Sequence, residues 1–191
     1  MMDTKQLMDS LALGTQVRLE DIPKIDLYID QVIQLFEEAF EETKRNEDEK
    51  ILTKTMVNNY AKGKLFYPVQ NKKYTRNHIM LISLIYQMKS GLSINDVKKV
   101  LEGLNEKAAE RDWSLEGFYE SFLEVQRGNV EIFADGIQRQ AMSAAQEVSG
   151  MENAEELEQI LLIASLIHTS NLYRRAAEKM VDELNARRES Q

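Results

Sequence analysis

The spacing of apolar residues predicts helices along most of the chain. In the first hundred residues, apolar positions recur every three to four residues in several stretches. The predicted helices of this part cover residues 4–13, 26–46, 52–61, 75–89 and 93–103. Their expected N-caps include Asp26, Thr53, Thr75 and Ser93. Side-chain oxygens of these residue types accept hydrogen bonds from the free N–H groups of a helix start. Gly63 is expected to end the third helix in a left-handed conformation.

The segment between the third and fourth predicted helices lacks this period. Lys64–Tyr74 contains Pro68, aromatic residues and the polar sequence Gln70-Asn71-Lys72-Lys73. Polar residues with a tolerance for unusual backbone angles favour a tight turn. We therefore expect a short β-hairpin with this polar sequence at its tip.

The second half of the chain also follows a helical pattern. Leu115, Phe118, Tyr119 and Phe122 recur at i, i+3, i+4 and i+7. We expect a break at Gly128-Asn129, a restart of the stripe at Val130, and a second break at Ser149-Gly150. A last long helix is predicted over Glu155–Arg188. Its Ile160–Ile167 portion is apolar nearly all round, which indicates either a buried element or a subunit contact.

The composition narrows the class of protein. The chain has 191 residues and no cysteine, so the sequence excludes disulfides and thiolate metal sites. It has only eight Gly and two Pro, which are too few turn residues for a sheet of many strands. The longest apolar run, at Ile160–Ala164, is far shorter than the roughly 20 residues that span a bilayer. The first thirteen residues are amphipathic and do not resemble a signal peptide. We expect a cytoplasmic protein without membrane contact.

Charge is strongly segregated along the chain. Residues 50–100 hold ten Lys or Arg and a single acid, Asp96, although the whole chain has a net charge of −8. Such a basic island attracts polyanions locally while the remainder of the molecule repels them. Within it, Thr55, Asn58, Asn59 and Lys62 share one face of a predicted helix at i, i+3, i+4 and i+7. Asn suits bidentate pairing with adenine, and Thr can contact a thymine methyl group. Any surface helix shows a polar face, so the stripe alone also fits an ordinary solvated helix.

Three sequences within the island resemble the winged helix domain of the MerR family. Asn58–Pro68 resembles that family's recognition helix, which ends near a Tyr, and the Gly-Leu-x-x-Pro-like turn that follows it. Tyr74–His78 resembles the segment that closes the basic wing. Gly91–Val97 is similar to the family's Gly-Phe-Ser-Leu-x-Glu-Ile segment. In this chain the helix before the recognition helix is longer than in that family, and Lys72 and Lys73 replace an Arg-rich wing tip. This resemblance implies a winged helix-turn-helix fold and DNA binding.

A second resemblance covers roughly residues 20–105. Ile25–Gln31 and Leu52–Tyr60 are similar to the YkrK-like group, an uncharacterised bacterial family catalogued as a domain of unknown function.

By the MerR-like resemblance, the helix that carries Asn58 and Asn59 would face the groove of DNA, and the loop lysines would contact phosphates. The DNA-binding residues that we expect are Thr53, Lys54, Thr55, Asn58, Asn59, Tyr60, Lys62, Lys64, Lys72, Lys73, Tyr74 and Arg76.

Catalytic motifs find little support in the sequence. His78 and His168 fall on separate predicted helices without metal-ligand spacing, and there is no Gly-x-Ser-x-Gly or phosphate-cradling glycine loop. Scattered Met residues and the C-terminal aromatic residues could line a ligand pocket, although core packing explains them as well. We therefore expect no enzyme activity, metal or cofactor, and leave open a small-molecule effector.

These observations lead to one overall prediction. The protein is expected to be all-α with a small β-hairpin wing: a winged helix-turn-helix module with its N-terminal arm over residues 1–103, then a helical bundle over residues 104–191. The expected function is transcriptional regulation through sequence-specific binding of double-stranded DNA as a homodimer. The alternative is a protein-interaction or adaptor protein whose basic segment docks an acidic partner.

Overall fold

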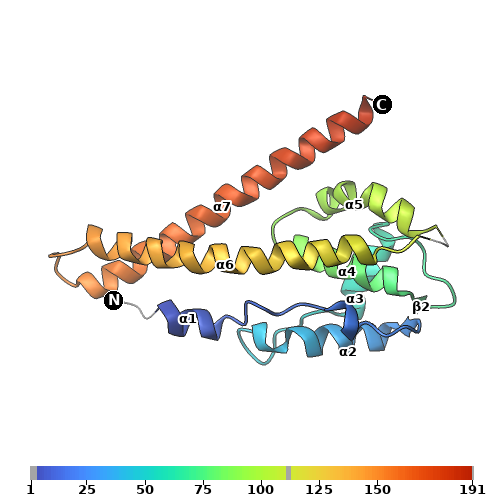
Figure 1. Ribbon diagram of the computed structural model, residues 1–191, viewed down its shortest axis with the longest axis horizontal. Coiled ribbons are helices and arrows are strands. Elements are labelled where there is room, and N and C mark those ends of the chain that lie inside the picture. Colours follow the sequence, from blue (N-terminus) through green and yellow to red (C-terminus); the bar gives the residue numbers. More distant parts are fainter. Residues whose placement is uncertain (1–3, 111–112, 191) are drawn as a thin grey trace. The chain divides into compact units, whose positions relative to one another are not determined.

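Helices make up most of the protein in the computed structural model, which describes residues 4–110 and 113–190 (Figure 1). The α-helices are α1 (Thr4–Ser10), α2 (Ile29–Phe40), α3 (Lys54–Lys62), α4 (Arg76–Met88), α5 (Ile94–Ala108), α6 (Glu116–Glu147) and α7 (Ala154–Glu189). Two 3₁₀ turns, η1 (Leu19–Asp21) and η2 (Glu41–Thr43), and two strands, β1 (Leu27–Tyr28) and β2 (Lys73–Tyr74), complete the order. The prediction of a mainly α protein with a small β element is confirmed. The first three residues of the predicted N-terminal arm lie outside the described residues.

The chain forms two compact units. One combines Thr15–Leu123 with Ala177–Gln191, and we call it the core unit. The other combines Met1–Gly14 with Glu124–Ala176, and we call it the hairpin unit. Both α6 and α7 contribute residues to each unit.

The core unit is built around α4. Its residues from His78 to Ile85 are all buried, because helices and loops cover this helix on every side. Phe36 and Phe40 of α2 contact Tyr86, with ring centroids 6.0 and 4.7 Å apart. Val97 and Leu101 bury the inner face of α5. The buried apolar residues of this unit form one continuous cluster that extends from Val17 to Leu123. A domain of about a hundred residues needs such a core for independent stability.

The predicted caps of three helices are confirmed. Thr53 Oγ1 accepts a hydrogen bond from Met56 N–H at 3.1 Å and starts α3. Thr75 and Ser93 start α4 and α5 in the same way. These short-range signals succeed because a cap is defined within four residues of sequence.

Several predicted helix ends are wrong. α2 starts at Ile29 rather than at Asp26, because the two preceding residues form β1, and it ends at Phe40 instead of continuing to Asn46. α5 passes Gly103 and continues to Ala108, and α6 runs without a break through Gly128. The cost of about 1 kcal/mol for a glycine inside a helix is smaller than the packing energy that these helices gain. The predicted break at Ser149-Gly150 is present, and Gly150 has a φ of +84°.

The predicted hairpin takes a different form. β2 pairs with β1, not with another part of Lys64–Tyr74, and the antiparallel register sets Leu27 opposite Tyr74 and Tyr28 opposite Lys73. Gln70 and Lys73 form an isolated bridge that closes the expected turn. The two residues between them have positive φ, which is the type I′ geometry of a tight hairpin turn. The turn is therefore present, while the strand that pairs with β2 comes from Leu27–Tyr28, much earlier in the sequence.

Gly63 does not adopt the left-handed conformation that we expected. Its φ is −71°, and Lys64 has the positive value, +56°. Glycine is still favoured at position 63, because a Cβ there would lie 2.7 Å from Leu65 Cδ1 and would force that side chain to shift. The buried Leu65 thus imposes the small residue, and the left-handed turn falls one residue later.

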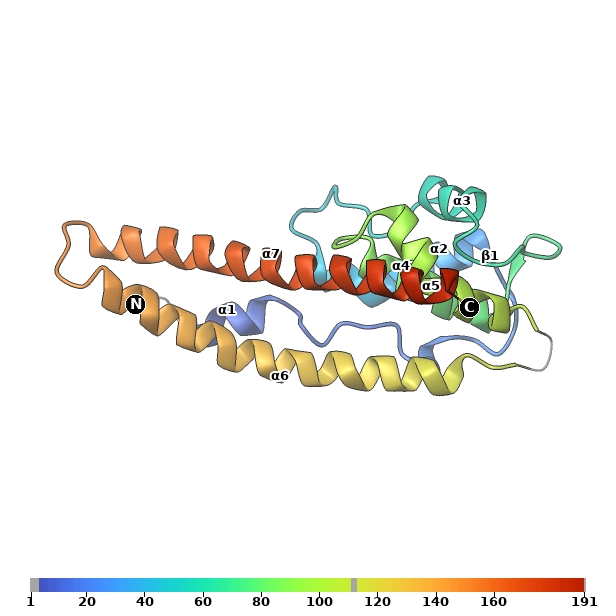
Figure 2. The same ribbon diagram turned by 90° about the horizontal axis from the view of Figure 1, so that it is seen from above.

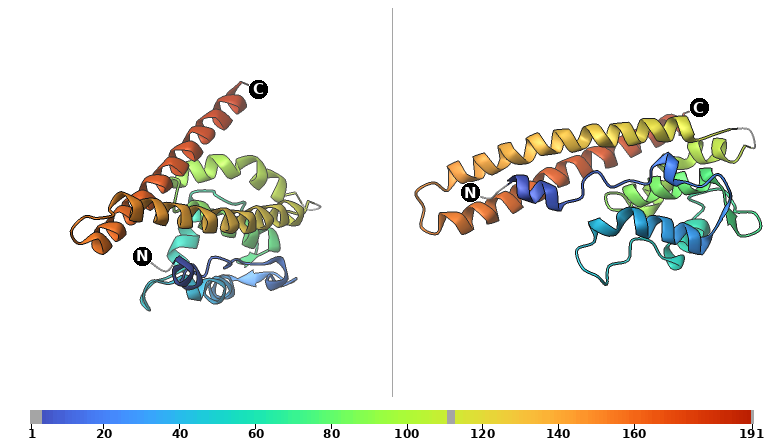
Figure 3. Two further views of the ribbon diagram at one scale, coloured as in Figure 1. Left: turned by 60° about the vertical axis from the view of Figure 1, so that its left-hand side comes forward. Right: turned by 60° about the horizontal axis from the view of Figure 1, so that its bottom comes forward.

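The hairpin unit contains antiparallel segments of α6 and α7 that run side by side, joined by the loop at residues 148–153 (Figure 3). Its buried apolar cluster is small and consists of Ala141, Ala144 and Leu162, with Leu166 packed against it. Gln140 crosses between the helices, donating to Thr169 Oγ1 at 3.2 Å and accepting from Ser165 Oγ at 3.4 Å.

The last turns of α7 belong to the core unit. Val181 is buried there, and Arg188 lies 3.6 Å from Glu102 on α5 and donates to the Lys99 carbonyl. An apolar hollow of about 440 Å³ lies where these turns meet α4 and α5, lined mainly by Met88, Leu92, Val100, Met180 and Leu184.

Candidate nucleic-acid interface

One face of α3 carries the predicted polar stripe. Thr55, Asn58, Asn59 and Lys62 are all exposed, and α3 contains no acidic residue. On the opposite face, Val57 and Tyr60 are buried in the core cluster. The inward anchors fix the rotation of the helix about its axis. As a result, the amide and hydroxyl side chains face solvent, where they are free to contact a ligand.

The start of α3 is held in place by a neighbour. Lys54 Nζ lies 2.7 Å from Asp30 on α2, although both side chains are largely exposed. The Thr53 side chain is engaged as the N-cap and is only partly exposed. Thr53 and Lys54 therefore have structural partners, whereas the stripe from Thr55 to Lys62 projects beyond them.

Three lysines lie on the segment that follows α3. Lys64 and Lys72 are exposed, and both have left-handed backbone angles, with φ of +56° and +60°. Lys73 is partly buried, and its Nζ lies 5.5 Å from the ring centre of the exposed Tyr28. Figure 2 shows α3 and the loop that leads into β2 towards the same end of the core unit. Tyr28 was absent from the expected interface, because a residue that pairs with β2 from a distant segment has no local signal.

Two tyrosines are misplaced by the sequence prediction. Tyr60 and Tyr74 are buried, so neither ring faces solvent where a groove could reach it. Tyr74 packs edge-on against Phe66, with ring centroids 6.2 Å apart. Burial raises the pKa of both phenols. Their role is to dock α3 and β2 onto the core.

Arg76 is also not a surface cation. Its Nε donates to Glu116 Oε1 at 2.8 Å, and its other nitrogens donate to the Ile22 and Leu19 carbonyls. The guanidinium therefore joins α4, α6 and the chain before β1. The structure gives no support to the expectation that Arg76 holds a phosphate, because each of its three nitrogens already donates to a protein acceptor.

Replacement of Arg76 by glutamine should accordingly reduce stability. The ion pair with Glu116 is partly exposed and contributes little, but two backbone carbonyls lose their donor, at an expected cost of about 2 kcal/mol. Urea unfolding of the full chain, followed by circular dichroism, measures this cost. Lys62→Gln, which removes an exposed cation on α3, is the matched control and should leave the midpoint unchanged. Equal midpoints for Arg76→Gln and wild type would contradict the structural role.

His78 lies at the first turn of α4, behind this surface, and is only 1% exposed. Its Nδ1 accepts from the Thr75 N–H at 3.1 Å, and its Nε2 lies 3.1 Å from the Tyr67 carbonyl. These partners assign a neutral ring with the proton on Nε2. Burial lowers the pKa of His78 to about 4, although the Tyr67 carbonyl and Asp26 act in the opposite direction. The sequence did not indicate that His78 takes the place of Glu or Gln in a capping box.

Asn77 is a positioning residue that the sequence did not indicate. Its side-chain amide donates to the carbonyls of Ala108 and Trp113, and its oxygen accepts from Leu115 N–H. These bonds tie the end of α5 and the start of α6 to α4. A polar residue on a predicted helix carries no signal for such long-range contacts.

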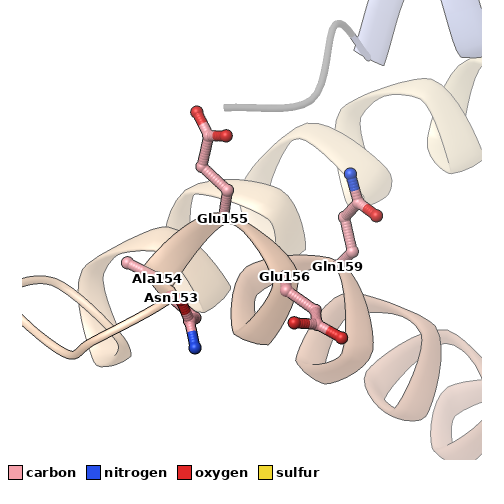
Figure 4. Close-up of a pocket in the computed structure, with 5 residues that line it drawn as sticks. All are labelled: Asn153, Ala154, Glu155, Glu156 and Gln159. Atoms are coloured by element: carbon pink, nitrogen blue, oxygen red, sulfur yellow. The ribbon is translucent and has the colours of Figure 1, made fainter.

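Two further hollows in the described part of the chain do not assemble a chemical site. A cavity of about 450 Å³ next to His78 is lined by Lys24, Asp26, Tyr67 and Trp113 among others, and its Arg76 and Asn77 donors are engaged as described above. A second polar hollow, at the start of α7, is shown in Figure 4: Glu155 and Gln159 point one way, and Asn153 and Glu156 another. Among the described residues, no group of three or more His, Asp or Glu side chains is arranged to hold a metal ion. None of the described helices is long and apolar enough to cross a membrane.

Comparison with protein families gives one match. The model described as "Domain of unknown function (DUF1836)" matches residues 17–122, which is more than half of the chain. The chain belongs to the DUF1836 family. No curated protein and no solved structure matches it.

The DUF1836 segment coincides closely with the main part of the core unit, Thr15–Leu123. It includes α2 to α5, the two strands and the polar stripe of α3. The expected membership in an uncharacterised family is thus confirmed at the level of DUF1836, while neither the YkrK-like name nor the MerR-like segment is supported by the comparison.

Proposed function

We propose that this DUF1836 protein binds double-stranded DNA sequence-selectively through α3 and acts as a transcriptional regulator. The observation that carries the proposal is the exposed stripe of Thr55, Asn58, Asn59 and Lys62 on a helix whose other face is anchored in the core. An α-helix fits the major groove of B-DNA, and amide side chains there can pair with adenine in a bidentate manner.

The loop lysines supply the second part of the proposal. In it, the segment from Lys64 to Lys73 serves as the wing, and Lys64, Lys72 and Lys73 contact phosphates beside the groove. Residues 50–100 keep a surplus of nine positive charges, ten bases less one acid, in a chain whose net charge is −8. This field favours a polyanion at the basic part of the surface and disfavours it elsewhere. A regulator of this kind reads two half-sites as a homodimer.

The first test uses a variant pair that separates base reading from phosphate binding. Bound duplexes are selected from a random pool with the full-length protein, and affinities are measured by fluorescence anisotropy at several salt concentrations. Asn58→Ala/Asn59→Ala should lower affinity for the selected site by roughly tenfold to a hundredfold and leave nonspecific affinity unchanged, because only base contacts are lost. Lys64→Gln/Lys72→Gln should weaken binding to all duplexes and reduce the salt slope by about 2.

A third variant controls for net charge. Lys98→Gln/Lys107→Gln removes two exposed cations from α5, which the proposal leaves outside the interface. It should change binding much less than Lys64→Gln/Lys72→Gln does. If the two lysine pairs weaken binding equally, Lys64 and Lys72 are not the phosphate contacts; if no duplex is enriched over the pool, α3 does not read DNA.

A further inference from the structure

α7 carries an apolar stripe that faces away from its partner helix in the hairpin unit. Leu162, Ser165 and Thr169 point towards α6, where they contact the Ala141–Ala144 cluster and Gln140. Ile160, Ile163, Ala164 and Ile167 follow the i, i+3, i+4, i+7 pattern on the other side of the helix. The three isoleucines are 56%, 58% and 60% exposed. We call these four residues the outer stripe.

The described part of the hairpin unit buries few large apolar side chains between α6 and α7. Among the described residues, its buried apolar side chains are Ile137, Ala141, Ala144, Val148 and Leu162, and a glutamine crosses between the helices. Burial of one isoleucine side chain contributes about 1.5–3 kcal/mol. The outer stripe therefore leaves three large apolar side chains exposed, as many as the hairpin unit buries among its described residues (Ile137, Val148 and Leu162), and a stable helical layer requires a second layer against that surface.

Charge at the two ends of the stripe selects the kind of partner. Glu155 and Glu156 are exposed in the first turn of α7, and Arg174 and Arg175 follow the stripe at its other end. Glu156 and Arg174 are 18 residues apart (174 − 156), which is five turns at about 3.6 residues per turn, so both flank the same side of the stripe. A partner helix is complementary to this surface if it carries the same apolar stripe and sets its basic end against the acidic end of α7. A second α7 helix in the antiparallel orientation meets this condition.

We infer that the outer stripe binds the outer stripe of a second copy of this chain, with the two α7 helices antiparallel. A two-fold axis between Ile163 and Ala164 then sets Ile160 against Ile167 of the partner subunit. Glu156 comes within about one turn of Arg174 of the partner subunit at both ends. A parallel copy would instead bring the two acidic ends together and the two arginine pairs together. This inference specifies the homodimer of the proposed function, but it stands on the hairpin unit alone and can fail while DNA binding by α3 holds.

The mass of the full-length protein in solution provides the first test. Light scattering coupled to size exclusion should give a dimer for the wild type at micromolar concentration. Ile163→Asp should weaken the dimer roughly a hundredfold, because two isoleucines leave the interface and two carboxylates face each other. Ile132→Asp is the matched control, since Ile132 is 62% exposed on α6 of the same unit, and it should leave the dimer intact.

A wild-type monomer, or equal dissociation of both variants, would overturn the inference; the first result would assign the cover of the stripe to another part of the same chain. Circular dichroism confirms that each variant keeps its helical content. Loss of the dimer by Ile132→Asp alone would place the contact on α6 instead.

Cysteine cross-linking tests the orientation, and the absence of native cysteine makes it unambiguous. Ile160→Cys and Ile167→Cys chains, mixed and oxidised, should form a mixed disulfide. Neither chain alone should do so, because its own cysteines would be about 10 Å apart along the axis, beyond disulfide reach. Ala164→Cys, next to the axis, should link to itself. Self-linkage of Ile160→Cys at the rate of Ala164→Cys would indicate a parallel pair and would refute the proposed arrangement.

Discussion

Replacement of Tyr119 by alanine is expected to lower the free energy of unfolding by about 4 kcal/mol, the largest single effect that we predict. The Tyr119 side chain is 0% exposed and lies in the core unit. Its hydroxyl donates to the Val17 carbonyl at 2.7 Å and lies 2.8 Å from Ser83 Oγ. Alanine would leave a cavity of ring size and two buried polar groups without their partner. Urea unfolding of the full chain, followed by far-ultraviolet circular dichroism, measures the change.

Two further variants separate the ring from the hydroxyl. Tyr119→Phe keeps the ring and should cost about 1–2 kcal/mol, the penalty for a lost buried hydrogen bond. Tyr173→Ala removes a tyrosine that is 71% exposed on α7 and should change stability little. If Tyr119→Ala is no worse than Tyr173→Ala, then Tyr119 does not join the segment before η1 to α4 in the way the structure describes.

The second large effect is a loss of stability in mild acid. In the unfolded chain, His78 has its ordinary pKa of 6.5, whereas burial lowers the pKa to about 4 in the folded protein. Between these values the unfolded chain binds a proton that the folded chain does not, so the stabilising contribution is complete above pH 6.5 and is lost as the pH falls towards 4. The pKa difference corresponds to roughly 3 kcal/mol. Unfolding midpoints in urea at pH 7, 6, 5 and 4.5 measure it.

The slope with pH, rather than the absolute stability, identifies His78 as the cause. His78→Gln cannot titrate and can still accept the Thr75 N–H as a capping-box residue, so its stability should depend much less on pH between 6.5 and 4.5. His168→Gln removes the exposed histidine of α7 and should behave like wild type. A wild-type slope in His78→Gln would show that other groups cause the acid sensitivity.

Local signals explain which parts of the fold could be predicted. The starts of α3, α4 and α5 follow from their N-cap residues, Thr53, Thr75 and Ser93. Each of these side chains accepts a hydrogen bond from the backbone N–H three residues later. The pairing of β1 with β2 could not be predicted, because it joins residues far apart in the sequence and neither two-residue strand has a pattern of its own. The same long-range pairing explains why α2 begins at Ile29 and not directly after the expected N-cap, Asp26.

The candidate interface shows a similar division. Helical spacing predicted that Asn58 and Asn59 share one face of a helix, and in the structure both are exposed while Val57 is buried. The MerR-like resemblance suggested that Tyr74 and Arg76 belong to the same surface, but a tyrosine or an arginine is amphipathic enough to serve either inside or outside. Their inward orientation depends on β1 and on Glu116, which no local pattern connects to them.

The positive φ angles at Lys64 and Lys72 have a thermodynamic consequence. Each left-handed non-glycine residue costs about 1 kcal/mol relative to an ordinary conformation, and glycine would occupy either position without that penalty. Selection for thermal robustness alone would therefore favour glycine at both positions. A chain that carries lysine there accepts this cost and places a lysine side chain at the tip of a tight bend.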